Sequence, residues 1–351
     1  MITLKEIAQK CNVSIATVSN ILNGKSNVSE ETKNKVLKII QETGYKPNYM
    51  ARGLRATKSK TIGMIVDDIT AFGSPKIIEG IMEICDLFGY RSIMTNLRVY
   101  SKWLYSRPSH DEYVSIINSA IEEMISLKVD GIIFVGAYTR AIDFIPSDLE
   151  IPVVIAYSFS IDNSIPSVFI DDVQSAYEMT NYIIKQGHKK IAVITGEKDG
   201  LHTELRFQGF KKAMAEHSIE VDESLITSTS WDFAGGYKAC KEMNLADKVK
   251  SKEITALFCF NDLIAAGAYT YFGENGVKPG KDISIGGFDN QDIAECLSPL
   301  LTTMAIEVYE IGRKSAIVLL NKLKGLEPEE NNLQIPSLLI ERESVQQLKI
   351  Q

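Results

Sequence analysis

The chain has 351 residues, which is too long for one ordinary hydrophobic core and suits a small domain joined to a larger one. Its composition, 45% hydrophobic and 24% charged residues, is typical of a globular protein. No apolar run approaches the roughly 20 residues that span a bilayer, and residues 1–10 carry charges where an export signal has its apolar core. These features argue against a membrane or exported protein, so we expect a cytoplasmic one.

The formal net charge of −7 is unevenly distributed along the chain. Residues 1–60 contain nine Lys and two Arg against four Glu, a formal charge of +7, which leaves −14 for the remainder. A basic segment attached to an acidic body is typical of proteins that present one end to the phosphates of a nucleic acid. The charge pattern therefore predicts a head that contacts DNA.

The first 45 residues predict three short helices. Thr3 followed by Glu6 is a capping box, in which each side chain satisfies a free backbone N–H at the helix start. Ser14 can cap a second helix after a short turn, and Ser29 can cap a third that ends at Gly44. Two helices joined by three or four residues indicate a helix-turn-helix, here within an all-α, three-helix head.

The head contains the segments VSIATVSNILNG, VSEET and GYKPNYMAR in that order. This pattern resembles the DNA-binding head of the LacI/GalR family of transcriptional regulators along its whole length. The resemblance implies a DNA-binding domain over residues 1–47, followed by a hinge helix and linker over residues 48–60.

The resemblance also implies that the second helix lies in the major groove, where Ile15, Ala16 and Asn20 would face base edges. Family members commonly carry Arg at the position of Asn20, and Asn favours adenine where Arg favours guanine. The alternative is that Asn20 is an exposed residue without a base contact. The other residues expected to contact DNA, with Thr17 and Ser19 at phosphates, are Thr3, Ser14, Thr17, Ser19, Asn27, Tyr45, Asn48, Arg52 and Arg55.

Residues 48–56, NYMARGLRA, resemble the hinge helix of the family, which folds only on operator DNA. Asn48 would cap this helix, and Leu54 matches the position at which family members insert a leucine between base pairs in the minor groove. Gly53 weakens the isolated helix, which suits a segment that becomes ordered on binding. The alternative is a plain linker.

From Thr61 onward, short apolar runs alternate with amphipathic helical segments. This alternation predicts an α/β core with parallel sheets covered on both faces. The predicted strands are 62–66, 91–95, 131–135, 153–157, 190–195, 256–260 and 284–287. The predicted helices lie near 76–88, 112–127, 173–186, 204–217, 234–244, 262–275 and 307–323.

So many strand-helix units exceed one sheet, and we expect two lobes with a ligand cleft at the carboxyl ends of the strands. At landmarks such as TIGMIVDDI, KVDGIIFVG and ITALFCFNDLIAAGA, the segment resembles the periplasmic-sugar-binding-type core of LacI/GalR regulators. The resemblance implies a core over residues 61–345. Its N-lobe is expected at about 61–159 and 291–320, and its C-lobe at about 160–290 and 321–343.

A sugar presents an apolar ring face and many hydroxyl groups, so its site needs an aromatic platform and several polar side chains. Arg206, Trp231, Asn261 and Asp289 follow predicted strands or begin predicted helices, and each matches a position where family members contact their ligand. Arg206 can bind two oxygens, Asn261 and Asp289 can bind hydroxyl groups, and Trp231 would stack on the ring. Taken singly, Trp231 has an ordinary alternative as a core residue, Asp289 as a helix cap and Asn261 as a helix start.

Three further residues complete the expected effector site. Tyr157 stands at a strand end where the family often has Asp, and Phe72 and Ser74 belong to a segment that replaces Asn-Pro-Phe-Phe of many relatives. This departure moves or removes an aromatic wall of the N-lobe. Residues 97–112 form a longer loop than is usual in the family, which either lengthens the pocket for a larger saccharide or is an ordinary surface loop.

Neither catalysis nor a metal or cofactor is expected. The five cysteines are odd in number and never occur at CxxC spacing, and the four histidines are dispersed. Neither a nucleophile elbow nor a phosphate-binding glycine motif is present. We expect the cysteines to be reduced thiols, most of them buried.

The sequence thus predicts a DNA-binding transcriptional regulator, a repressor, that is controlled by a mono- or oligosaccharide. A homodimer is expected, because two heads match the half-sites of a palindromic operator and the C-terminus lacks the leucine heptads of a tetramer. The alternatives are a regulator controlled mainly by a protein co-effector, and an activator. A sugar-uptake protein is disfavoured because it would need an export signal and no basic head.

Overall fold

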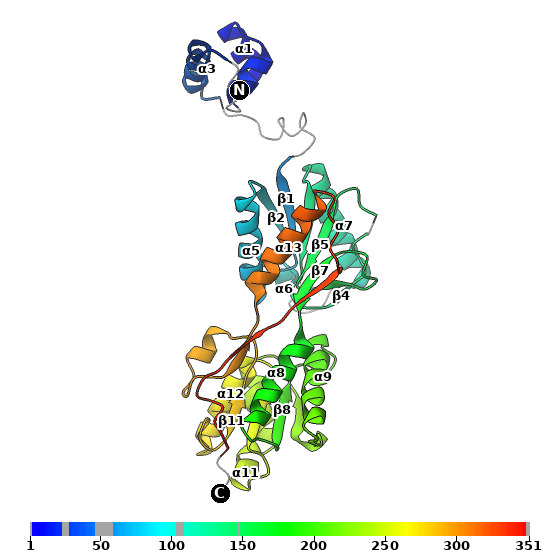
Figure 1. Ribbon diagram of the computed structural model, residues 1–351, viewed down its shortest axis with the longest axis vertical. Coiled ribbons are helices and arrows are strands. Elements are labelled where there is room, and N and C mark those ends of the chain that lie inside the picture. Colours follow the sequence, from blue (N-terminus) through cyan, green and yellow to red (C-terminus); the bar gives the residue numbers. More distant parts are fainter. Residues whose placement is uncertain (1, 23–27, 46–58, 103–108, 147, 349–351) are drawn as a thin grey trace. The chain divides into compact units, whose positions relative to one another are not determined.

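The computed structural model describes residues 2–22, 28–45, 59–102, 109–146 and 148–348. The chain forms two compact units, Met1–Ser59 and Lys60–Gln351 (Figure 1). The first unit contains the helical head and the second contains the whole α/β core. No helix in the described part of the chain is long and apolar enough to cross a membrane.

The head contains three helices, α1 (Leu4–Cys11), α2 (Ile15–Leu22) and α3 (Glu30–Thr43). Their ends are set by the predicted caps. The capping box of Thr3 and Glu6 is present, Ser14 and Ser29 each accept a backbone N–H in the first turn of their helices, and Gly44 ends α3 with a φ of 61°. The predicted helix-turn-helix head is confirmed, and its core is formed by Ile7, Ala8, Cys11, Val18, Ile21 and Val36.

The N-lobe of the core is built on a six-stranded sheet in the order β13-β7-β5-β3-β1-β2, with every neighbouring pair parallel. Its strands are β1 (Thr61–Val66), β2 (Arg91–Asn96), β3 (Gly131–Val135), β5 (Val153–Ala156), β7 (Ser167–Ile170) and β13 (Asn332–Ile335). The four central strands are buried throughout and the two edge strands, β2 and β13, are half-buried or exposed, as expected for a parallel sheet with helices on both faces.

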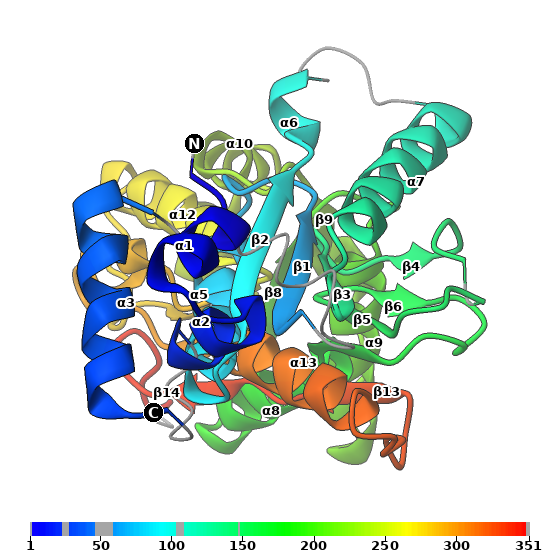
Figure 2. The same cartoon turned by 90° about the horizontal axis from the view of Figure 1, so that it is seen from above.

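Helices cover both faces of the N-lobe sheet. α5 (Ser74–Leu87) and α13 (Val308–Lys322) pack on one face, and α7 (His110–Ser126) packs on the other (Figure 2). Side chains of β1 alternate accordingly, since Met64 belongs to the cluster under α5 and α13 and Ile65 to the cluster under α7. The helices predicted near 76–88, 112–127 and 307–323 are therefore present.

The C-lobe is built on a four-stranded parallel sheet in the order β11-β10-β8-β9. Its strands are β8 (Ile191–Thr195), β9 (Ile226–Ser228), β10 (Ala256–Cys259) and β11 (Ser284–Gly286). α8 (Asp172–Lys185) and α9 (Leu201–Glu216) pack together, as do α10 (Phe233–Glu242) and α12 (Asp262–Glu274). The two-lobed α/β core predicted from the sequence is confirmed.

The remaining elements are short. They are α6 (Val99–Lys102), β4 (Ala141–Ile142), β6 (Phe159–Ser160), α11 (Leu245–Lys250), β12 (Thr303–Ala305), β14 (Leu338–Ile340) and the 3₁₀ turns Glu223–Leu225 and Asp292–Glu295.

The lobe boundaries differ from those expected from the sequence. β7 and β13 are strands of the N-lobe sheet, although residues 160–170 and 321–343 were expected in the C-lobe. Residues 291–301 contribute to the C-lobe core through Ala294 and Leu301, although they were expected in the N-lobe. The chain thus passes between the lobes after β7, after β12 and after β13 (Figure 1). Strand pairing across distant segments sets these boundaries, and local periodicity does not reveal it.

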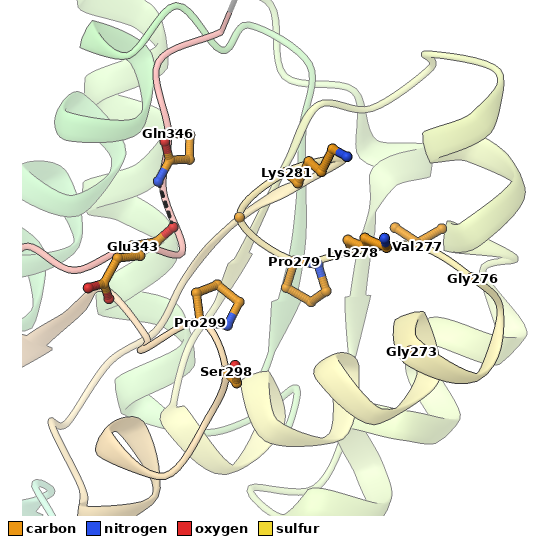
Figure 3. A pocket seen from close by; sticks show the side chains of 11 residues that line it. Gly273, Gly276, Val277, Lys278, Pro279, Lys281, Ser298, Pro299, Glu343 and Gln346 are labelled. Carbon is orange, nitrogen blue, oxygen red and sulfur yellow. Dashed lines mark hydrogen bonds between the residues drawn. The ribbon is translucent and has the colours of Figure 1, made fainter.

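The outer end of the C-lobe carries a hollow of about 530 Å³ (Figure 3). Its lining consists of glycines, prolines and a few polar chains, among them Lys278, Lys281 and Glu343, and contains no aromatic residue. It lies outside the expected effector site.

Candidate functional site

One face of α2 carries most of the expected base contacts. Ala16, Ser19 and Asn20 are spaced so that they share a side of the helix, with Ala16 exposed and the other two half-buried. Ile15 instead packs, partly buried, against the core of the head. The face that α2 can offer to DNA is therefore formed by Ala16, Ser19 and Asn20.

Other residues expected at DNA have partners inside the head. Thr3 caps α1, the hydroxyl groups of Ser14 and Thr17 lie 2.9 Å apart at the start of α2, and Tyr45 packs on the head core. Thr3 and Ser14 can still contact DNA, because helix caps lie at the N-terminal helix ends where phosphates bind. Outside the described residues lie the expected hinge helix and Asn27, Asn48, Arg52, Leu54 and Arg55.

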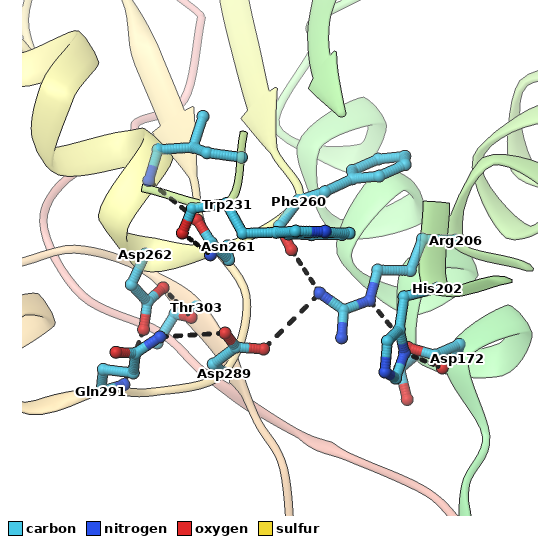
Figure 4. Close-up of polar contacts among 12 residues, drawn as sticks. Asp172, His202, Arg206, Trp231, Phe260, Asn261, Asp262, Asp289, Gln291 and Thr303 are labelled. Carbon is cyan, nitrogen blue, oxygen red and sulfur yellow. Dashed lines mark hydrogen bonds and ion pairs between the residues drawn. The ribbon is translucent and has the colours of Figure 1, made fainter. Parts of the chain in front are cut away.

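In the core, four side chains expected at the effector converge from separate segments of the C-lobe (Figure 4). Arg206 comes from α9, Trp231 from the turn before α10, Asn261 from the N-terminal cap of α12, and Asp289 from the segment after β11. They gather at the carboxyl ends of β8, β10 and β11, which is the edge where parallel α/β sheets bind ligands. We call these four residues the C-lobe cluster.

Arg206 is a buried cation between two carboxylates. Its Nε donates to Asp172 Oδ1 at 2.7 Å, and its guanidinium lies 3.5 Å from Asp289 Oδ1. It also donates to the carbonyl of Phe260, and its Cζ lies 3.6 Å from the ring centroid of Phe288. Burial alone would lower the pKa of Arg206, but Asp172 and Asp289 raise it above its ordinary value. The guanidinium is therefore held in one orientation at the site.

Trp231 lies across Gly196, the residue that follows β8. A Cβ atom at position 196 would lie 2.0 Å from the Trp231 ring, so only glycine permits this placement. Asn261 Nδ2 donates to the Trp231 carbonyl at 3.0 Å, while its Oδ1 accepts the N–H of Ile264 at 2.8 Å. Asn261 is thus a helix cap that also positions the aromatic ring.

Asp289 is held in an unusual backbone conformation, with a φ of 103° that residues other than glycine seldom adopt. Its Oδ2 accepts from Gln291 Nε2 at 3.0 Å. Burial raises its pKa to about 6, while Arg206 acts in the opposite direction. Strained residues of this kind are concentrated at ligand sites, and Tyr157, with a φ of 64°, is a second example.

Two residues that the sequence analysis did not select belong to the same site. Asp172, the first residue of α8, binds Arg206 through Oδ1 and His202 through Oδ2, where the distance to His202 Nδ1 is 2.8 Å. His202 Nε2 in turn accepts the backbone N–H of Thr139 at 3.3 Å. Asp172 lies two residues after the end of β7, a position that could have indicated it, but β7 itself was not predicted.

A buried carboxyl group, Asp262, lies beneath the C-lobe cluster. Thr303 Oγ1 donates to its Oδ1 at 2.6 Å, and the backbone N–H of Gln291 donates to its Oδ2 at 2.7 Å (Figure 4). Burial, and after it the neighbouring Asp289, raise its pKa to about 8. Asp262 therefore ties the start of α12 to β12, one of the segments that pass between the lobes.

The N-lobe contributes the remaining expected residues. The Tyr157 ring is buried, with its centroid 6.3 Å from that of His202, and a Cβ at Gly73 would lie 3.6 Å from Tyr157. The hydroxyl of Ser74 is buried and makes no hydrogen bond with the described residues, whereas Phe72 is exposed. The segment 72–74 is thus next to Tyr157, and Tyr157 is next to the C-lobe at His202.

A second ion pair fixes the N-lobe loop that contacts His202. Arg140 donates to Asp67 Oδ2 at 2.8 Å and to the hydroxyl of Tyr113, and its Cζ lies 4.8 Å from the Tyr138 ring centroid. The backbone N–H of Ala137 also donates to Asp67, at 2.9 Å. These contacts hold the loop of residues 136–140 at the carboxyl end of β3. In the described part of the chain, no group of three or more His, Cys, Asp or Glu side chains could hold a metal ion.

Comparisons with known proteins agree with this architecture. Residues 3–48 match the family model described as bacterial regulatory proteins, lacI family, and residues 180–345 match a periplasmic binding protein-like domain. The chain is 32% identical to the HTH-type transcriptional regulator RegA of Clostridium saccharobutylicum, over 97% of this chain and 98% of that protein. The chain belongs to the LacI family.

Two further relatives align with most of the chain. The chain is 31% identical to catabolite control protein A of Priestia megaterium, over 98% of this chain and 99% of the relative. It is 33% identical to the transcriptional repressor CytR of Escherichia coli strain K12, over 92% and 90% of the two chains. This LacI-family chain is therefore a DNA-binding transcriptional regulator.

Solved structures of the LacI family share the fold. The lac repressor dimer bound to operator and the anti-inducer ONPF matches with a TM-score of 0.79 at 23% identity, covering 98% of this chain and 99% of that one. A LacI-family regulator from Enterococcus faecium with bound ribose matches with a TM-score of 0.62 at 27% identity, covering 82% and 100%. The predicted combination of helical head and two-lobed core is confirmed.

Proposed function

We propose that this LacI-family regulator is a repressor whose operator binding is controlled by a saccharide held at the C-lobe cluster, between the two lobes. The observation that carries the proposal is the convergence of Arg206, Asp289 and Trp231 at the carboxyl edge of the C-lobe sheet. Together they offer a ring platform beside oriented donors and acceptors, which is what a polyhydroxy ring requires.

The charge balance of the cluster favours an uncharged effector. Arg206 is bound by Asp172 and Asp289, so its positive charge is already compensated within the protein. An anionic ligand would have to displace one of these carboxylates, and it would lie beside the other. A neutral saccharide needs no such displacement. The ribose bound to the Enterococcus faecium regulator shows that a relative with this core takes a sugar.

On the DNA side, we propose a homodimer that binds a palindromic operator, with Ala16 and Asn20 of each α2 at base edges in the major groove. The lac repressor, which shares the fold, binds its operator as a dimer. Leu54, in the segment 48–56, is proposed as the minor-groove wedge that couples the core to the head. A change in the angle between the lobes would alter the spacing of the two hinge segments and hence operator affinity.

The test combines a thermal-shift screen against mono- and disaccharides with gel shifts on DNA from upstream of the neighbouring genes. We expect one saccharide to stabilise the wild type and to change its operator affinity. Asp289→Ala should bind the operator normally and lose the response to that saccharide, with an effector affinity at least about 10-fold weaker. A normal response in this variant would exclude Asp289 as an effector contact.

The DNA contact of Asn20 is tested separately by selection of binding sites from random DNA. Asn20→Ala should relax the preference at one symmetric base position by about 1–3 kcal/mol and keep the salt dependence of binding. An unchanged preference would assign Asn20 to the surface of the head and not to base recognition.

A further inference from the structure

The loop of residues 136–140 in the N-lobe meets the start of α9 in the C-lobe. At this junction the backbone N–H of Thr139 donates to His202 Nε2 across 3.3 Å. The loop is held from the N-lobe side by the ion pair of Arg140 with Asp67, and His202 is held from the C-lobe side by Asp172. The two lobes are therefore joined here by a hydrogen bond between two well-anchored groups.

The partners of His202 define how its ring is protonated. A backbone N–H can only donate, so Nε2 must be the acceptor, and Nδ1–H must donate to Asp172 Oδ2 at 2.8 Å. The ring lies 6.3 Å from the Tyr157 centroid and 6.4 Å from the Trp231 centroid. His202 therefore stands between the N-lobe tyrosine and the aromatic platform of the C-lobe cluster.

Thr139, which donates this bond, and Thr203, the neighbour of His202 in the chain, each carry a buried hydroxyl group without a partner among the described residues. Thr139 is 1% exposed and Thr203 is 7% exposed, and neither Oγ1 makes a hydrogen bond in the described part of the chain. Buried threonines elsewhere in the core are paired: Thr180 Oγ1 donates to the Ala176 carbonyl at 2.7 Å, and Thr303 Oγ1 donates to Asp262. Because a buried hydroxyl loses its hydrogen bonds to water, an unpaired one calls for an additional partner.

We propose that Thr139 and Thr203 form a subsite at the lobe junction that binds a hydroxyl group of the effector. The proposal rests on the proposed function, which places the effector between the lobes. It adds two residues, one from each lobe, to which neither the sequence motifs nor the C-lobe cluster pointed.

The chemistry of the junction selects an uncharged group that can both donate and accept. The guanidinium groups of Arg206, on α9, and Arg140, next to Thr139, are occupied by Asp172 and Asp67, so a carboxylate or phosphate would find no uncompensated cation in these two groups. An apolar group would leave both threonine hydroxyls unpaired. A hydroxyl group can accept from one threonine and donate to the other, which matches the hydroxyl groups of a saccharide.

The subsite also explains how an effector could influence the lobes. A ligand hydroxyl bonded to Thr139 and Thr203 would connect the N-lobe loop to α9, beside the existing bond between Thr139 and His202. The ligand would then bind more tightly to this arrangement of the lobes than to one in which the loop and α9 are apart. Such a difference in affinity is the condition for a ligand to shift a conformational equilibrium.

The test replaces each hydroxyl by a methyl group of similar shape in the full-length chain, as Thr139→Val and Thr203→Val, with Thr180→Val as the matched control. Melting temperatures are measured first without added ligand. Removal of an unpaired hydroxyl should leave the melting temperature unchanged or raise it, whereas the control should lose stability because its hydroxyl is paired. A decrease in both variants as large as in the control would overturn the proposal.

Binding is then measured by calorimetry, with D-ribose, D-glucose, D-galactose, cellobiose and maltose as probes and the saccharide that most stabilises the wild type chosen for titration. We expect Thr139→Val and Thr203→Val each to raise its Kd about 5- to 10-fold and Thr180→Val to leave it unchanged. Unchanged affinity in both junction variants would overturn the subsite alone. A wild-type chain that binds none of these saccharides would instead overturn the saccharide effector, and the subsite with it.

Discussion

Two carboxyl groups lie close together, Asp289 in the C-lobe cluster and Asp262 beneath it, and burial raises the pKa of both. They have different surroundings. Asp289 faces Arg206 and can stay ionised near neutral pH, whereas Asp262 has a threonine hydroxyl and a backbone N–H as partners and no cation among them. Asp289, in the C-lobe cluster, is thus available as an acceptor, whereas the raised pKa of Asp262 favours its protonated form at neutral pH.

The raised pKa of Asp262 makes the stability of the core depend on pH. Its folded pKa of about 8 lies above the ordinary value of about 3.9, so between these pH values the folded chain holds a proton that the unfolded chain releases. Stability should therefore fall as the pH rises from about 4 to about 8. Asp262→Asn does not titrate, keeps an oxygen that can accept the Gln291 N–H, and presents an N–H to the Thr303 hydroxyl, which can accept as well as donate, so its stability should fall less.

The measurement is the melting temperature of the two proteins between pH 5 and 8.5. Because Asp289 is present in both, the difference between the two curves reports on residue 262. We expect the difference to change by at least about 1 kcal/mol, or roughly 2–4 °C, across this range. Parallel curves would show that Asp262 is ionised in the folded protein.

At the scale of secondary-structure elements, α5 and α13 of the N-lobe pack closely together. Gly312 of α13 and Gly80 of α5 permit the backbones to approach, since a Cβ at Gly312 would lie 2.1 Å from the carbonyl oxygen of Ile77 and one at Gly80 would lie 2.3 Å from that of Tyr309. Backbone atoms cannot move away as a flexible side chain can. The packing of this pair therefore depends on glycine at both positions.

Gly312→Ala should destabilise the core by about 1–3 kcal/mol, because α13 must shift away from α5. Gly273, near the end of α12, is the matched control, since a Cβ there meets nothing within 4 Å. Gly273→Ala should raise stability by about 0.5–1 kcal/mol through better helix propensity. Denaturant unfolding gives the free energy of unfolding of both variants. Equal changes in the two would mean that the close approach of α5 and α13 is not important for stability.

At the scale of the whole molecule, the chain separates its charges between two compact units. Residues 1–60 carry +7 and the remainder carries −14, and the compact units divide at residues 59 and 60. DNA phosphates attract the first unit and repel the second, so the affinity for operator must come from the head.

Operator affinity of the full-length chain should therefore fall at least about 100-fold between 50 and 200 mM salt. Binding releases cations from the DNA phosphates, and this release is less favourable when the salt concentration of the solution is higher. A fragment of residues 60–351 should bind no operator and keep the saccharide affinity of the full chain. Gel shifts and calorimetry on both proteins provide the measurement. Operator binding by the fragment would place the DNA site in the core and contradict the assignment of the head.

Much of the fold could be predicted from the sequence, because the signals are local. Thr3, Glu6, Ser29 and Gly44 mark helix ends by contacts within one turn, and hydrophobic periodicity located most strands and helices of the core. The strands β7, β9 and β13 were missed, since they are short and are stabilised by pairing with partners far away in the sequence.

The candidate site likewise contains residues that the sequence indicated and residues that it did not. Motifs indicated Arg206, Trp231, Asn261 and Asp289, because each follows a predicted strand or begins a predicted helix and matches a ligand position of the family, although Arg206 lies in the second turn of α9. His202, Asp172, Thr139 and Thr203 were not indicated, since their importance lies in contacts between residues 30 or more positions apart. Burial and the meeting of the two lobes assign their roles, and both arise only when the chain is folded, because they depend on which distant groups exclude water from one another.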